Sequence, residues 1–399
     1  MQHVSITHAA VQSGVPATEI AAWAKHGWII THGKGATRTV AHESVIARRD
    51  MLAGHVLPKR LPQPIVVPTK LTSVDLCAGA GGLTLGMEYA GITTVCTVDN
   101  NPVTVATIRA NRPAWHSRHA SCGATDLTDY AGAIDIVTAG FPCQPFSYAG
   151  TGDGFADTRG TVFFGILQQI VQLRPRFVLC ENVLGLTSHD TGRTLQTICC
   201  QLAATGYTVT TQHVHAHWYG VPQTRSRLII VGVRNDIHRI PQMPAADPVI
   251  RPVSVALADC PSSPGMTYSA AAHHLFTHVP EGGNWRDLPP VLQEAILGNS
   301  RRTSGGMTGI GRRLRMDAPS PTLTCSPVQR FTGRCHPHET RPLTVREYAR
   351  IQTFPDTWTF AGSLADQYRQ IGNAVPVQLA YQLGIMLVQM HTADCEDSA

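Results

Sequence analysis

The chain has 399 residues, of which 43% are hydrophobic and 15% charged, and its formal net charge is +5. This length can hold two or three domains with a substantial core, and the composition excludes a disordered or fibrous chain. We find no apolar stretch of membrane-spanning length and no N-terminal secretion signal in the sequence. We therefore expect a soluble cytoplasmic protein without a membrane partner.

The eleven cysteines are odd in number, scattered, and contain no Cys-x-x-Cys pair. This pattern excludes a disulfide scaffold and lacks the spacing of a zinc site. His213, His215 and His217 form a His-x-His-x-His run. Alternation along a strand explains that run without a metal, so we expect no metal site.

Residues 1–70 contain eight lysines and arginines against three acidic residues, which accounts for the whole positive excess. A basic segment favours a polyanionic partner, and a solvated surface is the alternative. Residues 5–26 have the pattern of two short helices around a Gly-containing turn, followed by a hairpin or wing over 27–40 and a helix over 41–53. This arrangement resembles a winged helix-turn-helix of small bacterial regulators. A helical interaction module that never touches DNA is the alternative.

A proline-rich linker precedes a region in which strands alternate with helices, which predicts a parallel sheet covered on both faces. The regularity fails over 235–310, where we expect a smaller inserted domain. The sequence thus predicts a helix-turn-helix-like module (1–56), a linker (57–70) and a sheet domain (71–234). The insert (235–310), a return to the sheet domain (311–392) and a tail (393–399) follow.

The segment 75–82 reads Asp-Leu-Cys-Ala-Gly-Ala-Gly-Gly, a strand that ends in a glycine-rich turn. Glycines let the backbone approach a ligand closely, and the N-terminus of the helix that follows favours a carboxylate or phosphate. Asp99, at the end of the next predicted strand, is placed to accept hydrogen bonds from a ribose. Alone, this pattern fits any nucleotide or S-adenosylmethionine site, and a tight turn without a ligand is the alternative.

The segment 140–147 reads Gly-Phe-Pro-Cys-Gln-Pro-Phe-Ser and follows a predicted strand over 134–139. Cys143 therefore belongs to a loop at the carboxyl end of a strand, where open sheets bind ligands. Prolines stiffen the approach to this cysteine, and a loop mouth gives a thiolate access. An inert loop cysteine is the alternative.

From residue 74 to about 385, apart from the insert, the chain resembles the cytosine-5 DNA methyltransferase family. Six motifs in the family's order carry this resemblance: 75–82 (cofactor loop), 140–147 (nucleophile loop), 181–183 (Glu-Asn-Val), 223–227 (Gln-x-Arg-x-Arg), and the closing motifs 341–347 and 370–376.

The resemblance implies an α/β fold with a Rossmann-like sheet domain of the S-adenosylmethionine-dependent methyltransferases and a smaller inserted target-recognition domain. The helix-turn-helix pattern of the first residues adds an N-terminal helical module of a DNA-binding kind. It implies transfer of a methyl group from S-adenosylmethionine to carbon 5 of cytosine in a specific double-stranded DNA sequence. The target base must be flipped out of the duplex to reach the enzyme.

The resemblance also implies roles for individual residues. Cys143 would add to carbon 6 of the base, Glu181 would protonate ring nitrogen 3, and Arg227 would hold the carbonyl at position 2. Arg225 would support the loop or a phosphate. The expected cofactor-binding residues are Asp75, Cys77, Ala78, Gly79, Gly81, Gly82, Asp99, Asn100, Asp126, Pro142 and Asn373. The expected DNA-binding residues are Ser147, Arg301, Arg302, Arg312 and Arg313.

One residue departs from the family's pattern: the family usually has Phe at the position of Cys77, and that ring packs on the adenine. The resemblance therefore does not say which side chain packs on the adenine here. The expected partners are double-stranded DNA and a restriction endonuclease that acts on the same site, in a bacterial cytoplasm, with a monomer or a dimer formed through the N-terminal module. Two rival functions stay open: a DNA-binding regulator, and methylation of RNA.

Overall fold

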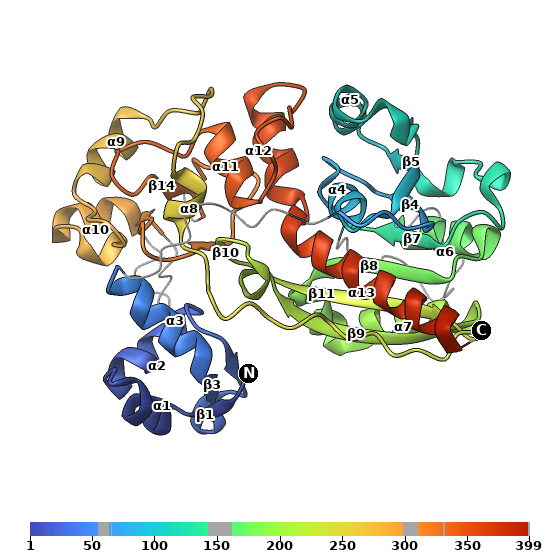
Figure 1. The fold of residues 1–399 in the computed structure, drawn as a ribbon. Coiled ribbons are helices and arrows are strands. Elements are labelled where there is room, and N and C mark those ends of the chain that lie inside the picture. The colour runs from blue at the N-terminus through green and yellow to red at the C-terminus, as the bar shows by residue number, and fades with distance from the viewer. Residues whose placement is uncertain (55–63, 65, 143–161, 298–309, 330–331, 398–399) are drawn as a thin grey trace.

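The computed structural model describes residues 1–54, 64, 66–142, 162–297, 310–329 and 332–397, and its centre is a seven-stranded sheet (Figure 1). The strand order is β6-β5-β4-β7-β8-β11-β9. In chain order these strands are β4 (Thr72–Leu76), β5 (Thr93–Asp99), β6 (Arg118–His119), β7 (Ile136–Ala139), β8 (Phe177–Val183), β9 (Tyr207–His215) and β11 (Ser226–Arg234).

The expectation of an all-parallel sheet is wrong for one strand. β11 runs antiparallel to both of its neighbours, β8 and β9. The chain passes from β8 through helix α7 (Arg193–Ala204) to the edge strand β9, and then turns back to insert β11 between the two. A short return of this kind produces an antiparallel pair, whereas a parallel neighbour needs a long crossover.

Helices cover both faces of the sheet, as its alternating side chains require. On one face, Phe177 and Ile229 pack against α4 (Gly82–Tyr89) and α13 (Val377–Asp397). On the other face, Val178 and Ile230 pack against α6 (Val162–Leu173) and α7. Figure 1 shows α13 lying along the sheet, so the C-terminal part of the chain closes the fold that β4 begins.

The stretch Leu364–Asp397 contains α12 (Leu364–Asn373) and α13, and its length and hydropathy are those of a membrane-spanning segment. This differs from the expectation that the chain has no such stretch. Because 72% of its most apolar window is buried inside the protein, its hydropathy is accounted for by packing in the core.

The first 52 residues form a separate small cluster with its own core. Helices α1 (Ile6–Ser13) and α2 (Ala17–His26) meet at Gly14, and α3 (His42–Leu52) follows a three-stranded antiparallel sheet of order β1-β3-β2. Gly14 adopts a φ of 72°, the left-handed conformation that ends a helix and that glycine tolerates best. The strands are β1 (His3–Ser5), β2 (Thr31–His32) and β3 (Thr39–Ala41).

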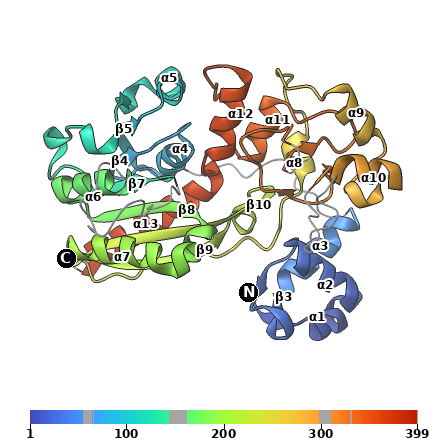
Figure 2. The ribbon, with the colours of Figure 1, turned by 180° about the vertical axis from the view of Figure 1, so that it is seen from behind.

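This N-terminal module is docked on the rest of the chain by specific contacts. The Arg48 guanidinium, only 4% exposed, forms an ion pair of 3.6 Å with Asp317 and donates to its backbone carbonyl. The guanidiniums of Arg48 and Arg315 each lie 5.0 Å from the ring centroid of Trp28. Figures 1 and 2 both place the module at the end of the molecule that carries α9 (Ala270–Thr277) and α10 (Pro290–Leu297).

Small residues allow α4 and α13 to cross closely. A Cβ atom on Gly86 would lie 2.5 Å from the amide nitrogen of Tyr381 and closer still to the Cβ of Ala380. We predict that Gly86→Ala lowers the free energy of unfolding by about 1–3 kcal/mol, because overpacking outweighs the gain of up to about 1 kcal/mol in helix propensity.

Chemical denaturation measures this change. Gly185→Ala is the matched control, since its added Cβ would meet no atom nearer than 3.9 Å. Equal stability of the two variants would contradict the close crossing.

Candidate active site

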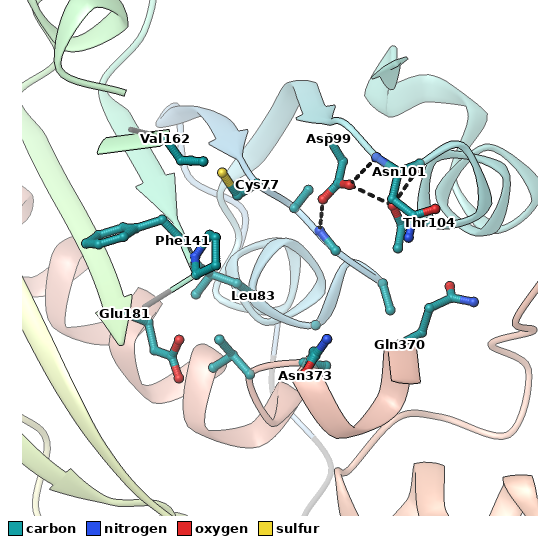
Figure 3. A pocket seen from close by; sticks show the side chains of 18 of the residues that line it. Cys77, Leu83, Asp99, Asn101, Thr104, Phe141, Val162, Glu181, Gln370 and Asn373 are labelled. Carbon is teal, nitrogen blue, oxygen red and sulfur yellow. Dashed lines mark hydrogen bonds between the residues drawn. The ribbon is translucent and has the colours of Figure 1, made fainter. Parts of the chain in front are cut away.

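A cavity of about 880 Å³ opens at the carboxyl ends of β4, β5, β7 and β8. Figure 3 shows that its wall also includes Gln370 and Asn373, which come from the other end of the chain, in α12. The carboxyl ends of parallel strands lie at the same edge of a sheet, and this is the edge at which open α/β sheets usually bind ligands. Most of the glycine-rich turn after β4 lines this cavity as well.

Asp99, at the end of β5, fixes the glycine-rich turn after β4. Its Oδ2 accepts a hydrogen bond from the Gly79 amide at 2.8 Å, while its Oδ1 accepts from the Asn101 amide and the Thr104 hydroxyl at 2.8 and 2.9 Å (Figure 3). A carboxylate offers about four acceptor positions, so roughly one position stays available to a ligand.

Asp75 lies beneath the turn and not in the cavity wall. It is 1% exposed, and one of its oxygens accepts from the Thr84 hydroxyl. Burial raises the pKa of this carboxyl to about 7, against the smaller opposing effect of the hydrogen bond from Thr84. Asp75 therefore shapes the strand end from behind, although the sequence pattern had placed it among the cofactor-binding residues.

The end of β7 leads into the loop predicted to carry the nucleophile. Phe141 is buried and Pro142 lines the cavity. The Asn182 side-chain amide donates to the Phe141 carbonyl at 3.1 Å and so holds the backbone two residues before Cys143. Cys143 and Ser147 lie outside the described residues. Asn182 belongs to the Glu-Asn-Val motif, but the sequence pattern predicted no role of its own for it.

Glu181 and Arg227 meet at the cavity from neighbouring strands. Glu181 Oε1 lies 2.6 Å from Arg227 Nε, and each side chain is 10% exposed. The antiparallel register of β8 and β11 pairs Arg227 with Val183 and Ile229 with Glu181, so the two charged residues are diagonal neighbours. A pair this poorly solvated has strong mutual electrostatics, because little water screens it.

Arg225 has a different environment from Arg227. It is 2% exposed and donates to the carbonyls of Leu323 and Gly372, at 3.3 and 3.1 Å. Burial, with a further contribution from Arg227, lowers its pKa to about 9. Of the two options left by the sequence, support of the surrounding chain fits these contacts, whereas a phosphate contact does not.

Two buried glutamines join the Gln-x-Arg-x-Arg segment to the C-terminal helices. Gln223 donates to Gln352 at 2.9 Å, and Gln352 donates to the carbonyls of Ile371 and Ala374. These contacts hold α12 against the cavity. Nothing in the sequence pattern marks Gln352, because its partners lie far away along the chain.

The structure brings eight of the predicted cofactor-binding residues into the cavity wall: Cys77, Ala78, Gly79, Gly82, Asp99, Asn100, Pro142 and Asn373. Gly81 is not among the residues that line the cavity, and a Cβ atom added to it would lie 3.0 Å from the Trp358 side chain. Asp126 is exposed, and its carboxylate accepts from the amide and hydroxyl of Thr128. The neighbouring Cys122 and Gly123 take the place in the wall that was expected of Asp126.

The arginines predicted to bind DNA differ in their environments. Arg301 and Arg302 lie outside the described residues, and Arg312 is half-buried in β12 (Arg312–Arg313). Arg313 was predicted to contact DNA, but the structure corrects this: it is 5% exposed and all five of its N–H groups donate inside the protein. The acceptors are the carbonyls of Phe276, Val279, His336 and Glu339 and the hydroxyl of Thr340.

Comparison with known proteins identifies the family of the chain. Residues 71–389 match the model of the C-5 cytosine-specific DNA methylase family. The type II methyltransferase M.PspPI of Psychrobacter sp. (strain TA137) is 46% identical over 334 residues, covering 81% of this chain and 80% of that protein. M.Eco47II of Escherichia coli is 46% identical over 329 residues, with 80% and 79% covered.

Among solved structures, the S. pombe Dnmt2 methyltransferase superposes with a TM-score of 0.54 at 18% identity, covering 80% of this chain and 99% of that one. The Entamoeba histolytica methyltransferase EhMeth gives 0.54 at 15% identity, with 80% and 98% covered. These likenesses establish the α/β methyltransferase fold. The match of residues 71–389 to the family model and the 46% identity to the type II methyltransferases show that the chain belongs to the C-5 cytosine-specific DNA methylase family. It is a DNA (cytosine-5-)-methyltransferase.

The buried Asp75 predicts a specific pH dependence of stability. Its folded pKa of about 7 lies above the value of about 4 for an unfolded aspartate, so between these values the folded chain holds a proton that the unfolded chain has lost. Its contribution to stability therefore falls as the pH rises from about 4 to about 7. We predict that Asp75→Asn removes this fall.

Chemical denaturation at several pH values tests the point. The stability of Asp75→Asn relative to the parent should rise from about pH 4 to about pH 7 and level off above it. Asp129→Asn, at an exposed site, controls for the loss of one negative charge. A difference that stays constant with pH would show that Asp75 is ionised in the fold throughout.

Proposed function

We propose that the enzyme transfers the methyl group of S-adenosylmethionine to a flipped-out cytosine in a specific double-stranded DNA sequence, with Cys143 as the covalent nucleophile. The Glu181–Arg227 pair carries this proposal. It lies at the cavity, beside the strand end that leads into the cysteine loop. A carboxyl group and a guanidinium in one poorly solvated site match the donors that a cytosine ring needs during the reaction.

Cys143 supplies the nucleophile that cytosine chemistry requires. Carbon 5 of an aromatic cytosine is a poor nucleophile, and addition of a thiolate to carbon 6 turns it into an enamine carbon. S-adenosylmethionine supplies the electrophilic methyl group. A base then removes the proton from carbon 5, and the thiolate leaves. The hydrogen bond from Asn182 to Phe141 supports this role because it fixes the chain two residues before the thiol.

Glu181 and Arg227 manage the charge that thiolate addition creates. Glu181 acts in this step as a protonated carboxyl group: it gives its proton to ring nitrogen 3 and accepts from the exocyclic amine, and Arg227 then stabilises the carboxylate that remains. The ion pair engages Oε1 of Glu181 with Arg227, which leaves Oε2 for the base. Arg227 Nη1 donates to the Ser226 carbonyl, and its Nη2 is the nitrogen offered to the carbonyl at position 2 of the ring.

The residues around the glycine-rich turn suit S-adenosylmethionine. Asp99 keeps about one acceptor position for a ribose hydroxyl. Helix α4 begins at Gly82 behind Gly81, which provides no side-chain cap, so its first amides can donate to the ligand's carboxylate. Phe141 and Pro142 offer an apolar wall to the adenine.

The irregular region after β11 is the part that we assign to target recognition. Phe276, Val279 and Leu288 form a small core of their own together with Cys335. Arg313 ties the same strands and helices together from inside. We therefore extend the recognition unit from 235–310 to about residue 340. Type II relatives favour a restriction endonuclease that cuts the same site as the functional partner, in a bacterial cytoplasm.

For the N-terminal module we propose contact with DNA. Lys25 and Lys34 are exposed on it. Its docking on Arg315 and Asp317 brings His26 near the arginines of this region, since burial and then the charges of Lys25, Arg312 and Arg315 lower the pKa of His26. Positive charges from two parts of the chain thus converge, which suits a polyanion. Binding to a promoter, including that of its own gene, is the regulatory form of the same proposal.

Bisulfite sequencing of DNA from cells that express the protein tests the main proposal. Expression should produce 5-methylcytosine at one short recurring sequence. Cys143→Ser should abolish it, while Cys200→Ser, at an exposed thiol on α7, should not. Methylation that persists in Cys143→Ser would exclude the covalent mechanism, and methylation in RNA alone would exclude DNA as the substrate.

Charge reversal tests the N-terminal module without removing its buried contacts. The double variant Lys25→Glu/Lys34→Glu should bind duplex DNA more weakly. The slope of log affinity against log salt concentration should fall by about 2, roughly one unit for each phosphate that is no longer neutralised. Lys70→Glu, exposed before β4, is the matched control. An unchanged salt slope would assign the module to protein contacts alone.

A further inference from the structure

Two thiols face each other in the wall of the cofactor cavity. The Sγ atoms of Cys77 and Cys122 lie 3.4 Å apart, although the residues are 45 positions apart in the chain. Both residues line the cavity, and both are free cysteines. A disulfide bond has an S–S length of about 2 Å, so the two sulfur atoms have to approach by roughly 1.4 Å, through rotation of the side chains and a shift of the chain that carries them.

The backbone holds both cysteines in place. Cys77 has a φ of 63°, a left-handed conformation that costs an L-residue energy and persists only when its surroundings enforce it. The Cys122 carbonyl accepts from the buried Gln169 side chain on α6 at 2.9 Å, which fixes the other partner. The encounter of the two thiols is therefore a fixed feature of the cavity and not a chance approach of two mobile side chains.

The pKa values of the two thiols are shifted in opposite directions. A hydrogen bond from the Cys77 thiol lowers the pKa of Cys122, against the opposing effect of burial. The same hydrogen bond, together with burial, raises the pKa of Cys77. Cys122 is thus the more readily ionised of the two thiols, and the thiolate is the form that reacts with oxidants.

We propose that Cys77 and Cys122 form a reversible modification site for hydrogen peroxide, and that their disulfide closes the cavity to S-adenosylmethionine. The Cys122 thiolate attacks one peroxide oxygen, the O–O bond breaks, hydroxide leaves, and a sulfenic acid remains. The Cys77 sulfur then attacks the Cys122 sulfur, and the hydroxyl group leaves as water with the Cys77 proton. Two thiols are oxidised to one disulfide and one peroxide is reduced to two waters.

The disulfide acts on the cofactor because of where it forms. Cys77 lies two residues before Gly79, whose amide donates to Asp99, so a bond to Cys122 draws the start of the glycine-rich turn toward the segment that carries Cys122. The shift changes both the adenine-facing surface and the carboxylate that meets the ribose. This inference rests on the proposed S-adenosylmethionine site, and the experiment separates the two.

The experiment uses the full chain with Cys143→Ser, so that oxidation of the proposed nucleophile plays no part. Affinity for S-adenosylmethionine is measured by calorimetry before peroxide, after it, and after dithiothreitol. We expect at least a tenfold loss of affinity on oxidation, full recovery on reduction, and a Cys77–Cys122 disulfide in peptide mass spectra. Cys122→Ser in the same background should bind equally with and without peroxide, whereas Cys200→Ser should respond like the parent.

Each remaining outcome is decisive. If the reduced protein does not bind S-adenosylmethionine, the proposed cofactor site itself is wrong. If the reduced and oxidised proteins bind equally, or if oxidation weakens Cys122→Ser as much as its parent, only the peroxide-sensitive pair is overturned. Absence of the Cys77–Cys122 peptide after oxidation overturns it as well.

Discussion

One buried guanidinium connects the segments that enclose the cavity. Arg225 leaves β10 (Gln223–Thr224) and reaches the carbonyls of Leu323 and Gly372, which lie 98 and 147 positions further along the chain. A cation without water is stable only when hydrogen bonds replace its hydration, so the two carbonyls have to stay in place. Asn373, in the cavity wall, is the next residue after one of them. The shape of this part of the cavity thus depends on an arginine that donates to two backbone carbonyls of the cavity wall.

The direction of strand β11 also shapes the cavity, because it decides which side chain meets Glu181. A strand parallel to β8 would begin at the edge of the sheet where β8 begins. Its last residues, and not its first, would then lie beside Glu181. Because β11 instead starts at the cavity, its first residues lie beside the last residues of β8, and Arg227 reaches Glu181. The hairpin-like return from β9 therefore delivers a positive charge to the carboxyl-end edge of the sheet, where the preceding parallel strands all end.

Local sequence patterns were sufficient for what depends on near neighbours. They predicted the strands β4, β5 and β7, the turn at Gly14, and the placement of Asp99 at a strand end, because alternation and glycine chemistry act over a few residues. They failed where the partners are distant. The direction of β11 depends on the path through β9, the burial of Arg313 depends on four carbonyls up to 37 positions away, and the contact of Cys77 with Cys122 spans two strands.

The N-terminal module shows how such distant contacts change an interpretation. As a sequence, it is a self-contained helical unit behind a proline-rich linker, which suggests a tethered accessory. In the structure, the Asp317 carboxylate receives Arg315 through two hydrogen bonds of 2.7–2.8 Å and Arg48 from the module at 3.6 Å. Ile30 and Ala41 also pack on Ile250. Since burial lowers the pKa of Arg48 to about 10 and Asp317 partly offsets this, separating the two parts would leave a charge pair to be resolvated and an apolar contact exposed. The module is thus held in a fixed orientation to the segment that carries Arg315 and Asp317.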